Sequence, residues 1–427
     1  MLSSQSPPPA VGIDFGTTNS AIAIARAPGA PSEVLGLPHP VGGTTPTWRT
    51  VLCFEPAPAE RGPAVITAGA PAITRWAERE GEARLVQSIK SHLASASFVD
   101  TMILGRRWRV QDLIAKYLRE LRAAAPIDLG RRAVIGRPVR YWGAEDEEDD
   151  ARAIERMREA LTAAGFDEVT FEYEPVAAAY AYASRLDHDE LVLIADFGGG
   201  TSDFSVVEVG PGRARVLASS GVALAGDSFD ARIIDAVVSP ALGRGSRYDV
   251  EMGGDAPVPS WIYNKLRRWH HLSFLKTTET VQLLERIRHG AQDRAAIDRL
   301  CTLIEDDLAL PLHASVESTK VALSRADAAR LEFARHGVAI AADVARLDFD
   351  AWIAEELAAI DSAVTEALTA AGADARSIDR VFTTGGSSQV AAVRRTLAAR
   401  FGDDKLVGGE ELTSVAAGLA AVAATRL

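Results

Sequence analysis

The sequence predicts an α/β protein of two lobes, and three observations predict it. The chain has 427 residues, more than one ordinary domain, and its 47% of hydrophobic residues suffice for sizeable cores. Strand-like segments alternate with helical ones, which is typical of an α/β lobe. Two turns rich in glycine and threonine lie far apart in the chain, and each follows a strand that contains an aspartate near its end.

The first lobe is predicted over residues 10–190, after a tail over 1–9 whose proline and serine content predicts disorder. A strand, a turn and a strand are expected over 11–25, and a small inserted subdomain over 46–110. The other elements expected in this lobe are helices over 83–94 and 110–125, a strand over 131–139, and helices over 151–164 and from Pro175 to 185.

The second lobe is predicted over 191–403 and begins with three strands that end at Val222. A mostly helical insertion over 227–348 follows, and excursions of this kind usually form mobile caps over a cleft. The chain then forms a strand over 380–384, a glycine turn and a helix. The final segment, 404–427, is expected to return to the first lobe and to contain an alanine-rich helix over 413–425.

The two glycine-bearing turns carry the prediction of function. They read VGIDFGTTNS over 11–20 and LIADFGGGTSDF over 193–204. Glycine permits backbone angles and close approaches that a Cβ forbids, so the amides of such turns can point at an anion. Asp14 and Asp196 can hold a hydrated cation against the same phosphates. One turn alone could equally be an ordinary hairpin, but the pair predicts two lobes that grip one polyphosphate.

Two commoner phosphate motifs are excluded. No G-K-[ST] follows either turn, as a Walker loop requires, and no G-x-G-x-x-G opens a helix after a strand. The remaining interpretation is the actin-like ATPase fold, which is ribonuclease H-like, with a nucleotide cleft between the lobes.

Composition limits the partners and the compartment. The net charge of −12, without a concentrated stripe of lysine and arginine, argues against nucleic-acid binding. No apolar run is long enough for a membrane span, and the start of the chain has no signal-peptide pattern. Cys53 and Cys301 fit a reducing compartment, so a cytoplasmic protein is expected. The acidic run over 145–150 fits a solvated helix start better than a metal site.

Several segments, in the order of the family, resemble the nucleotide-binding domain of the DnaK-type heat-shock chaperones. The two turns resemble its phosphate loops, YEPVAAAYAY resembles its hinge-glutamate helix, and LAGDSFD resembles the start of its second-lobe insertion. VESTKVALS and FTTGGSS are similar to the segments on either side of the adenosine. SIKSHLASAS and AVIGRPV favour the short YegD-like branch, which lacks the peptide-binding half.

The resemblance implies binding of ATP or ADP with Mg²⁺. It assigns the metal to Asp14, Glu174 and Asp196, mostly through water, and catalysis to Glu174, Asp196, Thr201 and Asp203. Without the resemblance, Glu174 is equally well a capping carboxylate at a helix start. The nucleotide contacts that it implies are Asp14, Gly16, Thr17, Thr18, Asn19, Gly198, Gly199, Gly200, Thr201, Gly226, Asp227, Glu317, Lys320, Ser324, Gly385, Gly386, Ser387 and Gln389.

Departures from the family pattern predict a weaker site. Val321 and Gln389 stand where the chaperones sandwich the adenine between arginines, so cation–π stacking of about 0.5–2 kcal/mol is lost. The phosphate-contacting lysine is expected in AGAPAITR, where the register places Ile73, and Arg75 would substitute poorly. A missing cation would cost about two or three powers of ten in rate. Leu412 replaces an aspartate near the nucleoside.

These observations favour a chaperone-like, Mg-dependent ATP-binding domain that acts as a nucleotide-controlled switch, with slow or absent hydrolysis. A protein partner or co-chaperone would then supply substrate binding. Two alternatives stay open: a small-molecule kinase of the sugar or acetate type, which shares the fold, and a non-hydrolysing regulator or actin-like filament protein.

Overall fold

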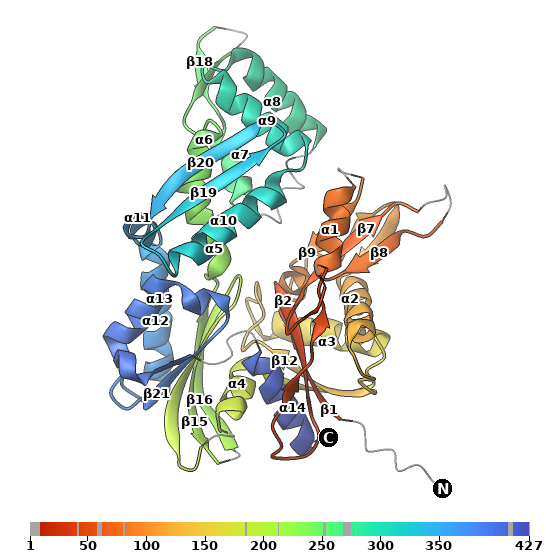
Figure 1. The fold of residues 1–427 in the computed structure, drawn as a ribbon, viewed down its shortest axis with the longest axis vertical. Coiled ribbons are helices and arrows are strands. Elements are labelled where there is room, and N and C mark those ends of the chain that lie inside the picture. Colours follow the sequence, from red (N-terminus) through yellow and green to blue (C-terminus); the bar gives the residue numbers. More distant parts are fainter. Residues whose placement is uncertain are drawn as a thin grey trace. The chain divides into compact units, whose positions relative to one another are not determined.

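The computed structural model describes residues 9–40, 42–57, 62–79, 82–183, 186–211, 213–250, 253–267, 275, 277–408 and 413–426. Leu412 and residues 1–8 of the tail expected over 1–9 lie outside them. The chain forms two compact units (Figure 1). The first comprises the described residues up to 223 with 360–388 and 396–426, and the second comprises 224–359 and 389–395. Both of the larger sheets lie in the first unit, and the division into lobes at residue 190 stays a prediction.

The first large sheet has six strands, in the order β13-β12-β1-β2-β3, with β6 paired to β2. β1 runs antiparallel to β2 and parallel to β12. Its side chains alternate between the two faces, as in any strand. Val11, Ile13 and Phe15 join a core with α2 and α3, whereas Gly12 lies against α14. The elements are β1 (Ala10–Phe15), β2 (Asn19–Ala25), β3 (Glu33–Val34), β6 (Trp48–Arg49), β12 (Arg132–Arg137), β13 (Glu168–Tyr173), α2 (Val110–Ala124), α3 (Glu147–Ala163) and α14 (Ser414–Arg426).

Smaller elements follow the first hairpin. They are β4 (Leu37–Pro38), β5 (Thr44–Thr45), β7 (Val51–Glu55), β8 (Val65–Ala68), α1 (Ala70–Glu78), β9 (Arg84–Gln87), the 3-10 helix η1 (Ile89–His92), β10 (Asp100–Ile103) and β11 (Arg106–Arg109). The helix expected over 83–94 is wrong. Residues 84–87 pair antiparallel with β7, so tertiary pairing overrides the helical spacing of Leu85, Ile89 and Leu93.

The second large sheet has the order β16-β15-β14-β21-β22. β14 is antiparallel to β15 and parallel to β21, so the strands expected from residue 191 to 222 and over 380–384 are confirmed. The elements are β14 (Glu190–Phe197), β15 (Ser202–Gly210), β16 (Arg213–Val222), β21 (Arg380–Thr384), β22 (Leu406–Gly408), α4 (Glu174–Ala183), α12 (Ala354–Ala370), α13 (Ala391–Phe401), η4 (Gly386–Gln389) and η5 (Asp403–Lys405).

The last helix, α14, packs tightly within the first unit. A Cβ on Gly418 would lie 1.7 Å from the carbonyl oxygen of Ala177 in α4, and one on Gly12 would lie 2.2 Å from the amide nitrogen of Ala420. Both contacts therefore require glycine. Buried residues of α4, α14 and the second sheet form one core that also includes Val134 of β12.

The second unit is mainly helical and also contains two hairpins, β17-β18 and β19-β20, while an inserted subdomain with the bounds 227–348 stays a prediction. Its elements are α5 (Gly226–Ile233), the π-helical η2 (Ile234–Val238), α6 (Ser239–Ala241), β17 (Arg247–Asp249), β18 (Asp255–Pro257), α7 (Ser260–Leu266), α8 (Thr278–Gly290), α9 (Arg294–Glu305), α10 (Ala309–Leu323), β19 (Ala328–Arg335), β20 (Val338–Ala345) and α11 (Arg346–Trp352). Among the described residues, no helix has the length and apolarity needed to cross a membrane.

Candidate functional site

Both glycine-bearing turns are tight hairpins at the ends of strands. Asp14 is the penultimate residue of β1, and Asp196 is the penultimate residue of β14. In the first turn a Cβ on Gly16 would lie 2.1 Å from the carbonyl oxygen of Asn19, so only glycine fits. In the second turn the amide of Gly198 donates to the carbonyl of Thr201 at 2.9 Å. The other predicted phosphate contacts, Thr17, Thr18, Gly199 and Gly200, lie within the same turns.

Four carboxylates of the first unit influence one another electrostatically: Asp14, Glu174, Asp196 and Asp203. Asp203 lies opposite Asp196 in the pairing of β14 with β15. Burial, with the nearby charge of Glu174, raises the pKa of Asp14 to about 8 and that of Asp196 to about 6. Burial and the charge of Asp196 raise the pKa of Asp203 to about 8. The first unit thus concentrates negative charge where a cation would be stabilised.

The structure corrects the expectation that this cluster lacks a lysine. Lys90, on η1, places its Nζ 2.7 Å from Oε1 of Glu174, and both side chains are 11% exposed. Burial alone would lower the pKa of Lys90, but the charges of Glu174 and Asp14 outweigh burial and raise that pKa. Neither residue expected at the lysine position serves the site. Ile73 packs against an apolar cluster under β7, and Arg75 pairs with Glu55 at 3.5 Å.

A compositional signal could have identified Lys90. Lysine and arginine together number 46 in the chain, and only six of them are lysines. Among the lysines that the structure describes, Lys90 and Lys320 are both 11% exposed and form ion pairs with carboxylates. In a chain that places arginine at most basic positions, a lysine indicates a site where a compact ammonium is needed.

Glu174 begins α4, and its position is fixed from two sides. A Cβ on Gly136 of β12 would lie 3.1 Å from Cγ of Glu174, so the neighbouring strand leaves just enough room for this side chain. Lys90 holds its carboxylate on the other side. Glu174 therefore belongs to the charged cluster and is more than a helix-capping carboxylate.

The third predicted turn, after β21, lies against the second. Gly385 has a φ of +81°, and a Cβ there would lie 2.0 Å from the carbonyl oxygen of Phe197. The hydroxyl of Ser387 donates to the carbonyl of Gly198 at 3.2 Å. Gly386 begins η4 beside them. Sequence reasoning missed the adjacent Thr384, whose hydroxyl donates to Asp196 at 2.6 Å.

The residues predicted to contact the nucleoside lie in the second unit, apart from the turn after β21. Lys320 of α10 donates to Asp230 at 2.8 Å and to the carbonyl of Gly226 at 3.3 Å. Burial raises the pKa of Asp230, and sequence reasoning missed this partner. The second unit also contains Asp227, Glu317, Ser324 and Gln389. That these residues share a nucleotide with the first unit stays a prediction.

The carboxylates fit a hydrated magnesium ion. Within the described part of the chain, no three His, Cys, Asp or Glu side chains are grouped so that they could hold a metal ion themselves. Mg²⁺ prefers oxygen ligands and keeps several of its waters, so it does not need such a group. Burial and then the repulsion of Glu174 raise the pKa values of Asp14 and Asp196, and a dication near them would offset both effects by stabilising the ionised carboxylates.

Comparison with known proteins shows the family. The family model described as "Hsp70 protein" matches residues 76–253 and 284–426. The chain belongs to the Hsp70 family. This membership implies the actin-like ATPase fold, with which the mixed α/β architecture and its several sheets agree. The expected resemblance to DnaK is thereby confirmed, while the YegD-like branch stays a prediction.

Two curated relatives are named "Chaperone protein DnaK". The protein from Thermosipho melanesiensis is 32% identical over 307 residues, which are 70% of this Hsp70 chain and 42% of the relative. The protein from Thermosipho africanus is 29% identical over 420 residues, 97% of this chain and 58% of the relative. The chain thus spans about half the length of the curated relatives it matches.

Proposed function

We propose that this Hsp70-family chain is a chaperone-like nucleotide-binding domain that binds ATP and ADP with Mg²⁺ and switches conformation with the nucleotide state. One observation carries the proposal: Lys90, only 11% exposed, is paired with Glu174 among three further carboxylates. Two of these, Asp14 and Asp196, lie at the ends of strands that lead into the glycine turns. A lysine among acids suits a ligand that brings both negative charge, for the ammonium, and a metal ion, for the carboxylates.

The parts of the cluster have separate roles in this proposal. Amides and hydroxyls of the two turns bind the phosphates. Asp14, Glu174 and Asp196 would hold Mg²⁺, which would supply charge neutralisation at the phosphates when bound. Asp203 and Thr201 help to orient the attacking water, and the ammonium of Lys90 stabilises the transferring phosphate.

The presence of Lys90 changes the expected rate of ATP hydrolysis. The sequence predicts slow or absent hydrolysis because it identifies no lysine at the phosphate-contacting position. Since Lys90 supplies a cation in the cluster, we propose slow hydrolysis. The nucleoside end is looser, since Val321 and Gln389 provide no guanidinium to stack on the base. We therefore expect weaker or less base-selective binding than two arginines would give.

The switch would depend on two lobes closing on the nucleotide, with the second unit as the moving cap. The residues that support this step are those predicted to contact the nucleoside, Glu317, Lys320 and Ser324. A protein partner or co-chaperone would detect the closed state and supply substrate binding.

Isothermal calorimetry with MgATP tests the binding proposal. The wild-type protein is expected to bind, and Asp196→Asn is expected to bind more weakly because it loses one of the acids that would order the metal's waters. Equal and negligible heats for both proteins would refute the proposal. Screening sugars and carboxylates for stimulated ADP release checks the kinase alternative, and light scattering after addition of ATP checks filament formation.

A further inference from the structure

The short helix that carries Lys90 cannot hold its own position. η1 has only four residues, and 3-10 helices of this length have poor hydrogen-bond geometry. Its cap residue, Ser88, has a φ of +51°, in the left-handed region that disfavours any residue with a Cβ. Such a conformation persists only where the surrounding structure holds it. Contacts from outside η1 must therefore fix Lys90.

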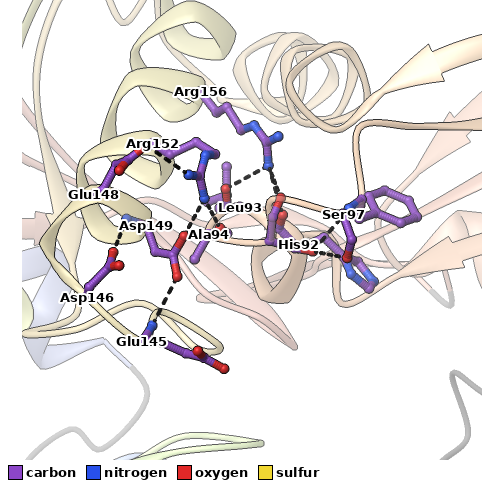
Figure 2. A network of polar contacts seen from close by, with 12 residues as sticks. His92, Leu93, Ala94, Ser97, Glu145, Asp146, Glu148, Asp149, Arg152 and Arg156 are labelled. Carbon is purple, nitrogen blue, oxygen red and sulfur yellow. Dashed lines mark hydrogen bonds and ion pairs between the residues drawn. The ribbon is translucent and has the colours of Figure 1, made fainter.

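Two arginines of α3 bind the main chain directly after Lys90 (Figure 2). Arg152 and Arg156 are one helical turn apart, so both can reach the same segment. Each donates from its Nη1. The acceptors are four consecutive carbonyl oxygens: His92 at 3.3 Å, Leu93 at 2.9 Å and Ser95 at 2.9 Å for Arg156, and Ala94 at 2.9 Å for Arg152.

The acidic first turn of α3 orients Arg152. Asp149 forms an ion pair with Arg152 and accepts from the amide of Glu145 at 3.1 Å, and Glu148 lies 3.6 Å from the same guanidinium. Asp146 caps the helix by accepting from the amide of Asp149 at 2.9 Å (Figure 2). The acidic run thus does more than solvate a helix start, because part of it holds the arginine that binds the segment after η1.

Apolar packing also fixes η1. Ile89 and Leu93 are 2% and 0% exposed and belong to the core that contains α2 and α3. Packing alone is non-directional, whereas several hydrogen bonds to one guanidinium define a direction. Arginine suits this task because it is always protonated and its planar donors can serve several acceptors at once.

We propose that Arg156, supported by Arg152, is a positioning residue that holds the ammonium of Lys90 against Glu174. It acts through the main chain of 92–95 and touches neither nucleotide nor metal. This inference rests on the proposed function for its catalytic consequence, because the placement of Lys90 affects turnover only if a phosphate is transferred there.

Lysine labelling measures the position of Lys90 without nucleotide. An amine-acylating reagent is applied to the nucleotide-free protein, and mass spectrometry follows Lys90, with Lys116 of α2 as the internal reference. We expect slow labelling of Lys90 in the wild type and about tenfold faster labelling in Arg156→Met, since hydrogen bonds to a charged group are worth about one power of ten or more. Arg156→Lys should give a smaller increase.

Arg119→Met is the matched control. Arg119 of α2 also donates to a main-chain carbonyl, that of Ala163 at 2.9 Å, but this carbonyl lies at the end of α3 and not beside η1. Its loss should lower the melting temperature without changing the labelling of Lys90. Unchanged labelling of Lys90 in Arg156→Met would overturn the proposal. If that variant does not fold, the same comparison in Arg156→Lys and Arg152→Met decides.

Steady-state kinetics test the catalytic consequence. In Arg156→Met, kcat should fall by about tenfold to a hundredfold, the scale for a catalytic group displaced by about 1 Å, while KM for MgATP changes little. Arg156→Lys should recover part of kcat. An unchanged kcat beside faster labelling overturns the catalytic part. Absence of ATPase activity in the wild type would instead refute the proposed hydrolysis, and the labelling result would still decide the placement of Lys90.

Discussion

Replacing Lys90 by methionine tests the role of the buried ion pair in stability. Lys90 and Glu174 are 2.7 Å apart and mostly shielded from water, so removing one partner leaves a carboxylate buried among other acids. Breaking a buried pair in this way typically costs about 3–5 kcal/mol of unfolding free energy. We expect Lys90→Met to lose an amount in this range at about pH 8.

The loss should depend on pH in a defined direction. The raised pKa of Lys90 keeps its ammonium protonated through the neutral range, so the pH dependence comes from the acids. Asp14 and Asp196 have pKa values of about 8 and about 6, above the ordinary 3.8. As the pH falls, these groups take up protons in the folded state and reduce the repulsion. The variant should therefore lose less stability at about pH 5 than at about pH 8.

Urea titrations of four proteins measure the effect: the wild type, Lys90→Met, Glu174→Gln and the double variant. The double variant removes both charges, so it should be more stable than the sum of the single losses predicts. Lys116→Met is the control, since Lys116 pairs with Glu120 on α2 while 24% and 34% of these side chains are exposed. A partly exposed i,i+4 pair on one helix contributes about 0.5 kcal/mol or less. Similar small losses for Lys90→Met and the control, or strict additivity in the double variant, would refute the reasoning.

Three further predictions concern the same cluster. Asp14→Asn should stabilise the nucleotide-free protein at about pH 8 and have little effect near pH 4. Because the pKa of Asp14 is raised to about 8 in the folded state, the wild type loses stability as the pH rises from 3.8 towards 8, and the asparagine variant does not. Equal changes in the free energy of unfolding at both pH values would contradict this. Gly385→Ala should cost about 2 kcal/mol or more, since its φ is +81° and the Cβ would lie 2.0 Å from the carbonyl oxygen of Phe197; an unchanged thermal midpoint would disprove the clash. Thr384→Val removes the hydroxyl that donates to Asp196 and should raise the pKa of Asp196 above about 6; carboxyl NMR titration would show no shift if the bond were unimportant.

The parts of the fold that sequence predicts best are those determined by local chemistry. The hairpins at Asp14 and Asp196 follow from strand patterns that end in glycine and threonine, and both are present. The helix expected over 413–425 is α14, whose residues Ser414–Arg426 are rich in alanine. In each case the residues that specify the element lie within it.

What the sequence did not predict depends on distant partners. The spacing of Leu85, Ile89 and Leu93 mimics a helix, but pairing with β7 and the left-handed turn at Ser88 decide otherwise. The misassigned helix concealed the position of Lys90, which reaches Glu174 across 84 residues of sequence. Sequence alone could not show this contact, because no local pattern connects the two segments.

The packing of α14 has a consequence for the order of assembly during synthesis. The hydroxyl of Ser32 donates to the carbonyl of Ala417 at 2.8 Å, a contact between residues 385 positions apart, and Gly12 of the first strand lies against the same helix. Until the ribosome releases α14, the first sheet exposes the face that this helix will cover. A nascent chain must therefore keep this apolar face of the first sheet uncovered until Ser414–Arg426 have left the ribosome, so this sheet completes its packing only after all the elements between β1 and α14 have been synthesised.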